Sequence, residues 1–164
     1  MNASSIQNVS AHDIVAQLKK KDLTIATAES LTAGMLSSTL ADVPGASAVL
    51  QGGVVAYNNG IKHRLLGVSA DTLAARGAVD AETAKQMAKG ARDRFRADVG
   101  ISTTGVAGPE PSEGKAVGIV FIALSTAEQS TARLLRFEGN RDQIRRAAVA
   151  ASLRLVGEWL AQDN

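Results

Sequence analysis

The sequence predicts a single α/β domain, in which a mixed β-sheet lies between two layers of helices in a three-layer α/β/α sandwich. Two observations predict it. Short apolar runs with strand character alternate along the chain with segments of helical spacing. The 164 residues, 45% hydrophobic and 21% charged, have the length and composition of one globular domain. No repeat or linker divides the chain, so we expect one domain over residues 10–162, after a flexible N-terminal segment at 1–9.

The first half of the chain predicts mostly helices, separated by two short strands. Ser10 can cap a helix over the amphipathic segment AHDIVAQLKKKD. The expected order after it is a buried strand, a helix that Pro44 and Gly45 end, and a second strand that Asn58-Asn59-Gly60 ends. Two short helical pieces and a longer helix starting at Asp80 follow. These elements are expected at 23–27, 31–41, 54–57, 61–66, 69–76 and 82–97.

The second half predicts three strands and a long final helix. The segment ADVGISTTG reads as a buried strand that runs into a turn. The stretch after it, GVAGPEPSEGKA, contains two of the three prolines and is expected to be a loop. The apolar runs at 117–125 and 131–139 are expected to form a hairpin. The helix at 140–162 is amphipathic, and the residues expected to face the core are Ile144, Ala148, Ala151, Leu155 and Leu160.

Composition excludes several classes of function. The formal net charge is only +2 and there are five aromatic residues, so neither a basic surface nor a stacking platform for nucleic acid is expected. The absence of cysteine excludes disulfides and thiolate chemistry, and two histidines leave little for a transition metal. No apolar run is long enough to span a membrane, and the N-terminus lacks the pattern of a signal peptide. We therefore expect a cytoplasmic protein with no metal.

Small and polar residues cluster at three places, each directly after a predicted strand. The clusters are Glu29 to Gly34, Tyr57 to Lys62 and Thr103 to Gly108. In α/β sheets, ligands bind in the crevice beyond the carboxyl ends of the strands. We therefore expect the three clusters to share one crevice.

Ser30 is the candidate nucleophile of this crevice. In the segment TAESLTAG it stands where a strand gives way to a helix, so it is either an N-cap or a nucleophile beside the unpaired N–H groups of a helix end. A nucleophilic serine needs a base. Lys62 and His63 are adjacent on one short helix, so only one of them is expected to face inward. Burial would lower the pKa of Lys62 toward neutrality, and Tyr57 can relay a proton or hold Lys62 in place.

The glycine-rich loop and the start of the last helix contain the other candidates. The loop differs from a phosphate-binding Walker A motif, because five residues separate Gly108 from Gly114 and Ala116 follows Lys115. Its glycines would still let backbone N–H groups approach a ligand. Arg141 and Arg145 stand one helical turn apart and can both contact a phosphate, although a solvated or ion-paired helix face explains either residue slightly better.

Together, the motifs TAESLTAG, GGVVAYNNGIKHRLLGV, TTGVAGP and EGNRDQIRRAA resemble the C-terminal domain of the CinA (competence/damage-inducible) family. The resemblance covers about residues 10–160. It implies hydrolysis of the carboxamide of nicotinamide mononucleotide to nicotinate mononucleotide and ammonia, in pyridine-nucleotide salvage. It implies no cofactor and no metal. The longer proteins of this family also carry an N-terminal domain that resembles molybdopterin-binding domains, and no such domain is expected here.

The resemblance also implies roles for single residues. Ser30 resembles the nucleophile, Lys62 the base and Tyr57 its neighbour, and the sequence leaves open which of the last two transfers the proton directly. Arg145 is the preferred phosphate contact, although Arg141 also fits. The residues expected to line the pocket are Thr32, Ala33, Gly34, Thr104, Gly105, Ala107 and Gly108.

The chain also departs from the family pattern. Leu31 and Ala33 replace a cysteine and a glycine, neither of which carries the chemistry. The loop segment EPSEGKA has Pro111 and Ala116 in unusual places, and we expect this loop to shape substrate specificity. Two alternatives stay open: a nucleotide-binding module without turnover, and a Ser–Lys amidase for a substrate that is not a nucleotide. Exposed strand edges favour a homodimer that binds a small-molecule nucleotide.

Overall fold

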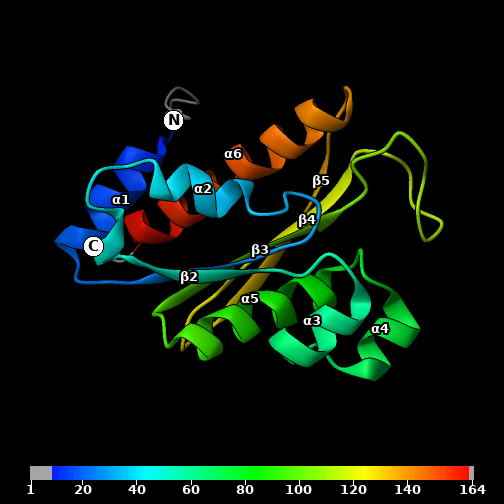
Figure 1. The fold of residues 1–164 in the computed structure, drawn as a ribbon, viewed down its shortest axis with the longest axis horizontal. Coiled ribbons are helices and arrows are strands. Elements are labelled where there is room, and N and C mark those ends of the chain that lie inside the picture. The colour runs from blue at the N-terminus through cyan, green and yellow to red at the C-terminus, as the bar shows by residue number, and fades with distance from the viewer. Residues whose placement is uncertain (1–8, 163–164) are drawn as a thin grey trace.

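The computed structural model describes residues 9–162 and shows one five-stranded mixed sheet (Figure 1). The strands lie in the order β2-β1-β3-β4-β5. The pairs β2–β1 and β1–β3 are parallel, whereas β3–β4 and β4–β5 are antiparallel. The strand bounds are Ile25–Glu29 (β1), Leu50–Val55 (β2), Val99–Gly105 (β3), Ile119–Ser125 (β4) and Ser130–Arg136 (β5). The predicted single α/β domain with a mixed sheet is confirmed.

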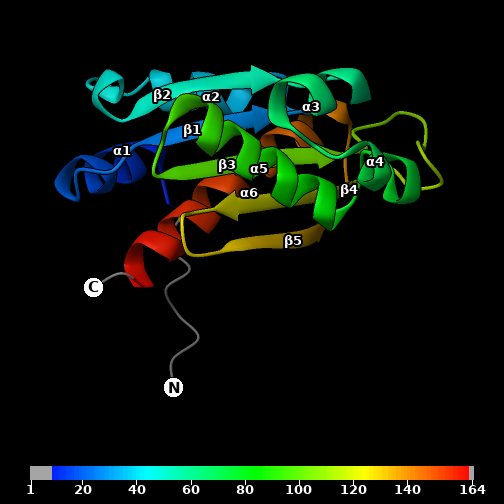
Figure 2. The same ribbon diagram turned by 90° about the horizontal axis from the view of Figure 1, so that it is seen from below.

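Helices cover both faces of this sheet, as Figures 1 and 2 show. One layer contains α1, α2 and α6, whose apolar side chains form the main core with alternate residues of β1, β3 and β4. The opposite layer contains α3, α4 and α5, and a smaller apolar cluster lies beneath it. The helix bounds are Ala11–Lys20 (α1), Met35–Ala41 (α2), Asn59–Leu66 (α3), Ala70–Arg76 (α4), Ala81–Phe95 (α5) and Arg141–Gln162 (α6), with a 3-10 turn at Ala46–Ala48.

Several elements lie where their sequence signals predicted them. Ser10 and Asp80 cap α1 and α5 through their side chains. The predicted hairpin is β4–β5, in which Ile119 pairs with Arg136 at one end and Ser125 with Ser130 at the other. All five residues of α6 that were expected to face the core are buried. Local signals therefore suffice for these elements.

Other predictions were wrong in their boundaries, and the largest difference concerns the segment that carries Ser30. The first strand ends at Glu29, two residues later than predicted, and α2 begins only at Met35. Residues 31–34 form a turn in which Ala33 and Gly34 have φ values of 49° and 95°. Left-handed backbone cannot continue a right-handed helix, so the helical spacing of the sequence overestimates α2 by four residues.

The second strand also differs from its prediction. It spans Leu50–Val55 rather than residues 54–57, so Ala56 and Tyr57 lie beyond its end. The predicted flexible segment 1–9 lies, apart from Val9, outside the described residues. No helix within residues 9–162 is long and apolar enough to cross a lipid bilayer.

Candidate active site

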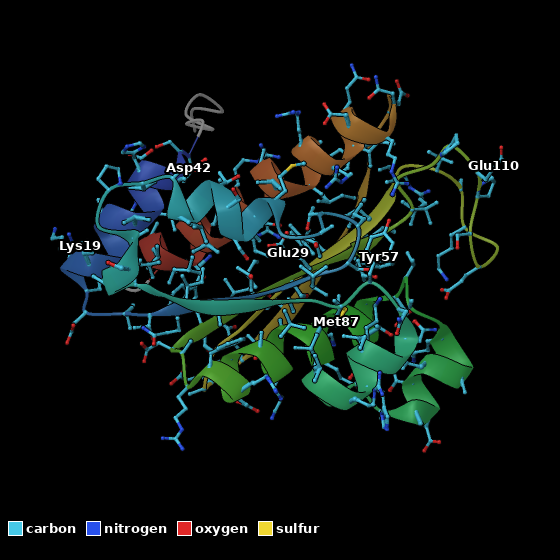
Figure 3. The ribbon with its side chains drawn as sticks, viewed as in Figure 1. Lys19, Glu29, Asp42, Tyr57, Met87 and Glu110 are labelled. Carbon is cyan, nitrogen blue, oxygen red and sulfur yellow. The ribbon has the colours of Figure 1, made fainter. Side chains whose placement is uncertain are left out.

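A cavity of about 250 Å³ opens at the carboxyl ends of β1, β2 and β3. The three polar clusters of the sequence meet there, as the strand order requires. Figure 3 shows Tyr57 at this end of the sheet, on the side of the loop that carries Glu110. The cavity is lined by Ser30, Leu31, Tyr57, Asn59, Lys62, Ala78, Val79, Thr104, Gly105, Ala107, Ser112, Glu113 and Arg141.

A serine and a lysine are in contact at the base of this cavity. The side chain of Asn58 caps α3 by accepting a hydrogen bond from the backbone N–H of Ile61 at 3.0 Å. This start to the helix directs Lys62 inward, where only 1% of the residue is exposed. The Lys62 Nζ donates to the Ser30 Oγ at 3.1 Å and to the carbonyl oxygen of Ala56 at 2.8 Å. The buried amine and the serine hydroxyl are therefore positioned for proton transfer.

Burial changes the protonation of Lys62. Loss of hydration disfavours the ammonium form and lowers the pKa of Lys62 to about 8, although the negative charge of Glu113 opposes this shift. His63 lies on the exposed side of α3, and its Nδ1 is 2.7 Å from the carbonyl oxygen of Val68. Of the two adjacent bases, Lys62 is thus the one that reaches Ser30.

The turn that carries Ser30 is organised by the buried carboxylate of Glu29, which Figure 3 shows beside α2. This carboxylate accepts five hydrogen bonds from neutral donors and makes no ion pair within residues 9–162. The donors are Thr32 Oγ1, Ser37 Oγ and the backbone N–H groups of Gly34, Leu36 and Ser37, at 2.6 to 3.0 Å. Glu29 therefore caps α2 from the end of the neighbouring strand.

This cap corrects the expectation that Ser30 stands at a helix start whose N–H groups serve the reaction. The N-terminal N–H groups of α2 are occupied by Glu29, and the Ser30 hydroxyl contacts Lys62 instead of capping the helix. Free donors lie in the turn instead. The backbone N–H groups of Leu31 and Thr32 have no hydrogen-bond acceptor in the part of the chain that the structure describes.

Arg145 supports the same turn from α6. Its Nε donates to the carbonyl oxygen of Leu31 at 2.9 Å, and one terminal nitrogen donates to that of Thr32 at 3.0 Å. Arg145 was the preferred phosphate contact, but its guanidinium is hydrogen-bonded to the backbone of the turn and does not line the cavity.

Arg141, one turn earlier on α6, does line the cavity. Its two terminal nitrogens donate to the carbonyl oxygen of Gly108 at 2.6 Å and to the hydroxyl of Tyr57 at 2.7 Å. Tyr57 is 57% exposed, so this pair of bonds crosses the mouth of the cavity. The capping box of Asn140 and Gln143 begins α6 at this point and thereby positions Arg141.

The remaining predicted residues divide into two groups. Thr104, Gly105 and Ala107 line the cavity with Ser30, Tyr57 and Lys62. The other group, Thr32, Ala33, Gly34 and Gly108, lies outside the lining. The Thr32 hydroxyl is buried against Glu29 and Thr103, at 2.6 and 2.8 Å. No cluster of three or more acidic, histidine or cysteine residues suited to a metal ion occurs in residues 9–162.

Sequence reasoning missed several lining residues, above all Glu113 in the glycine-rich loop and the pair Ala78 and Val79 before α5. The glycine that follows Glu113 indicates a tight turn between Ser112 and Lys115, but it does not show that the Glu113 side chain reaches the cavity. Ala78 and Val79 carry no such signal.

Comparison with known proteins agrees with this fold. Residues 7–160 match the family model described as the CinA C-terminal domain. A competence-damage inducible protein of Desulforamulus reducens is 51% identical over 84% of this chain, and a CinA-like protein of Frankia casuarinae is 45% identical over 90%. In each case the match covers 34% of the relative, so the chain spans about a third of the length of these proteins.

Solved structures of similar length also match. A competence/damage inducible protein of Agrobacterium tumefaciens has a TM-score of 0.87 at 36% identity, with 90% of this chain and 92% of that one covered. A CinA superfamily protein of Klebsiella pneumoniae has a TM-score of 0.90 at 31% identity, with 93% and 96% covered.

Proposed function

The chain belongs to the CinA C-terminal domain family, and from that premise we propose that it hydrolyses the carboxamide of nicotinamide mononucleotide to nicotinate mononucleotide and ammonia. The contact between Ser30 and the buried Lys62 carries the proposal. A serine hydroxyl is a weak nucleophile until a base removes its proton. An ordinary lysine is protonated at neutral pH, whereas burial gives Lys62 a pKa of about 8 and hence a useful fraction of neutral amine.

The reaction would proceed in two halves. Neutral Lys62 takes the proton of Ser30 Oγ as the oxygen attacks the carboxamide carbon, and the backbone N–H group of Leu31, which lines the cavity, stabilises the resulting oxyanion. Collapse of this intermediate breaks the carbon–nitrogen bond, and the ammonium of Lys62 returns the proton to the departing ammonia. A water molecule, deprotonated by Lys62, then attacks the acyl-enzyme, releases the carboxylate and restores Ser30.

Two neighbouring residues complete this proposal. Tyr57 was the other candidate for direct proton transfer, but its hydroxyl accepts a hydrogen bond from Arg141 at the mouth of the cavity. We therefore assign the proton transfer to Lys62. Arg141 takes the phosphate contact, because a guanidinium at the mouth suits the phosphate of a nucleotide whose amide reaches Ser30.

Ammonia release tests the proposal directly. Wild-type protein is incubated with nicotinamide mononucleotide in the presence of a chelator and without added metal, beside Ser30→Ala and Lys62→Met variants of verified fold. We expect turnover in the wild type and at least about a thousandfold less in either variant. If the folded wild type releases no ammonia, the amidase is refuted and a nucleotide-binding module becomes the better description. Equal rates on an amide without a phosphate would refute the nucleotide substrate.

A further inference from the structure

The carboxylate of Glu113 lies in the cavity wall, where it joins the glycine-rich loop to the segment before α5. Its Oε2 accepts hydrogen bonds from the backbone N–H groups of Ala78 at 2.8 Å and Val79 at 3.2 Å. The two segments are more than thirty residues apart in sequence. No hydrogen bond to the other carboxylate oxygen, Oε1, is present in residues 9–162. The carboxylate thus lines the cavity with one oxygen still available.

Glu113 lies in a tight turn whose left-handed backbone is unusual for a glutamate. Ser112 and Lys115 exchange two backbone hydrogen bonds, at 3.1 and 2.8 Å, around a two-residue turn. Both turn residues, Glu113 and Gly114, are left-handed, with φ values of 52° and 71°. Glycine tolerates this conformation and asparagine often adopts it, but glutamate has a steric cost there. A local need for a turn therefore does not explain the glutamate.

The opposite wall is shaped to receive the same carboxylate. Gly77 has a φ of 80°, and a Cβ atom on it would lie 2.5 Å from the Glu113 Oε2. Any side chain at this position would displace the carboxylate. The turn and the two N–H donors thus hold one negative charge at the cavity wall, and the missing side chain of Gly77 leaves room for it. The field of this charge reaches the base of the site, because it acts on Lys62.

We propose that Glu113 is a specificity residue, which selects substrates whose reacting amide is attached to a positively charged ring. The inference rests on the proposed function and refines it. In nicotinamide mononucleotide the ring nitrogen is bonded to ribose and carries a formal positive charge, which free nicotinamide lacks. A carboxylate in the wall attracts such a ring, and the guanidinium of Arg141 at the mouth attracts the phosphate at the other end. The cavity would thus match a ligand with a cation at one end and an anion at the other.

Two basic side chains line the same cavity. Lys62 contributes from α3 and Arg141 from α6, and both are cations when protonated. Without Glu113, these groups would leave the cavity with positive charge only and would repel the pyridinium ring. Glu113 is the only carboxylate among the described lining residues, so its replacement removes the one attraction for the ring.

The test separates binding from turnover by using the Ser30→Ala protein. Calorimetry measures its affinity for nicotinamide mononucleotide and for the uncharged analogue in which carbon replaces the ring nitrogen. The same pair of ligands is measured in Ser30→Ala proteins that also carry Glu113→Gln or Glu110→Gln. Glutamine keeps an oxygen acceptor for the N–H groups of Ala78 and Val79. Glu110 is exposed, lies in the same loop and is outside the cavity lining, so it is the matched control.

We expect the charged ligand to bind about tenfold more tightly than the neutral one, as one charge pair in a partly hydrated site provides. Glu113→Gln should bring this ratio close to one, whereas Glu110→Gln should leave it unchanged. If Glu113→Gln lowers the affinity for both ligands equally, the carboxylate only holds the loop in place and the inference is overturned. Equal binding of both ligands to Ser30→Ala alone, or binding of neither, also overturns it. Selective binding without ammonia release from the wild type would instead refute only the amidase.

Discussion

Replacing Lys62 by methionine should stabilise the fold at neutral pH, and this gain should shrink as the pH rises. Lys62 is buried, and its pKa falls from the ordinary value of 10.5 in the unfolded chain to about 8 in the folded protein. Below pH 8 both states are protonated, so folding must bury an ammonium group. Between pH 8 and 10.5 the unfolded chain binds the extra proton, so the stability of the wild type rises with pH.

The size of this effect follows from the two pKa values. Each unit of difference corresponds to about 1.4 kcal/mol, so the full penalty is about 3 kcal/mol, of which about 2.5 kcal/mol disappears between pH 7 and pH 10. The loss of the hydrogen bond to Ala56 adds an offset that does not depend on this titration. Methionine suits the site because it is unbranched and of similar length.

Urea denaturation at several pH values between 7 and 10 measures this difference. The free energy of unfolding is determined for the wild type and for Lys62→Met, and the change of their difference with pH is the tested quantity. Lys20, exposed in the last turn of α1, provides the control Lys20→Met for the loss of a lysine. A difference between wild type and Lys62→Met that is the same at pH 7 and at pH 10 would refute the reasoning, because burial would then not have changed the protonation of Lys62.

Four further outcomes are expected. Ammonia release by the wild type should rise almost tenfold per pH unit below pH 8 and level off above it, as a pH–rate profile would show, because the proposed base Lys62 must be neutral to accept a proton. Glu29→Gln should lower the free energy of unfolding by about 3 kcal/mol in urea, since an amide NH₂ group would face buried donors. In steady-state kinetics, Arg141→Ala should mainly raise KM for the phosphorylated substrate, whereas Arg145→Ala should mainly lower kcat by loosening the turn. Gly90→Ala should lower the melting temperature in a thermal scan, because its Cβ would lie 1.9 Å from a backbone carbonyl oxygen of α3.

The sequence predicts the elements whose signals are local. The caps at Ser10 and Asp80, the apolar runs of the β4–β5 hairpin and the apolar face of α6 all involve residues that are close in the chain. The start of α2 is different. Its helical spacing extends back to Leu31, but the donors of its first turn bond to Glu29 on β1. Spacing alone cannot show which residue supplies a cap.

The site divides in the same way. Three polar clusters follow three strands, and parallel strands bring their carboxyl ends together, so the crevice was visible in the sequence. The individual contacts within the crevice could not be predicted from the sequence. Arg141 meets Tyr57 across 84 residues, and Glu113 meets Ala78 across 35. Helical spacing makes Arg141 and Arg145 equally suitable as phosphate contacts. Their different roles depend on which loop each one reaches after folding.

The topology of the sheet also explains why the buried Lys62 forms no ion pair with the buried carboxylate of Glu29. Two buried ionisable groups flank Ser30: Glu29 precedes it on β1, and Lys62 reaches it from α3. A direct ion pair between them would stabilise the ammonium and keep the pKa of Lys62 high. The fold prevents this pairing, because Glu29 points toward α2 on one face of the sheet and is fully hydrogen-bonded there by neutral donors. Lys62 comes from the helical layer on the opposite face, where burial lowers its pKa. Because β1 lies between these two layers, Glu29 shapes the turn while Lys62 keeps the lowered pKa that the proposed proton transfer requires.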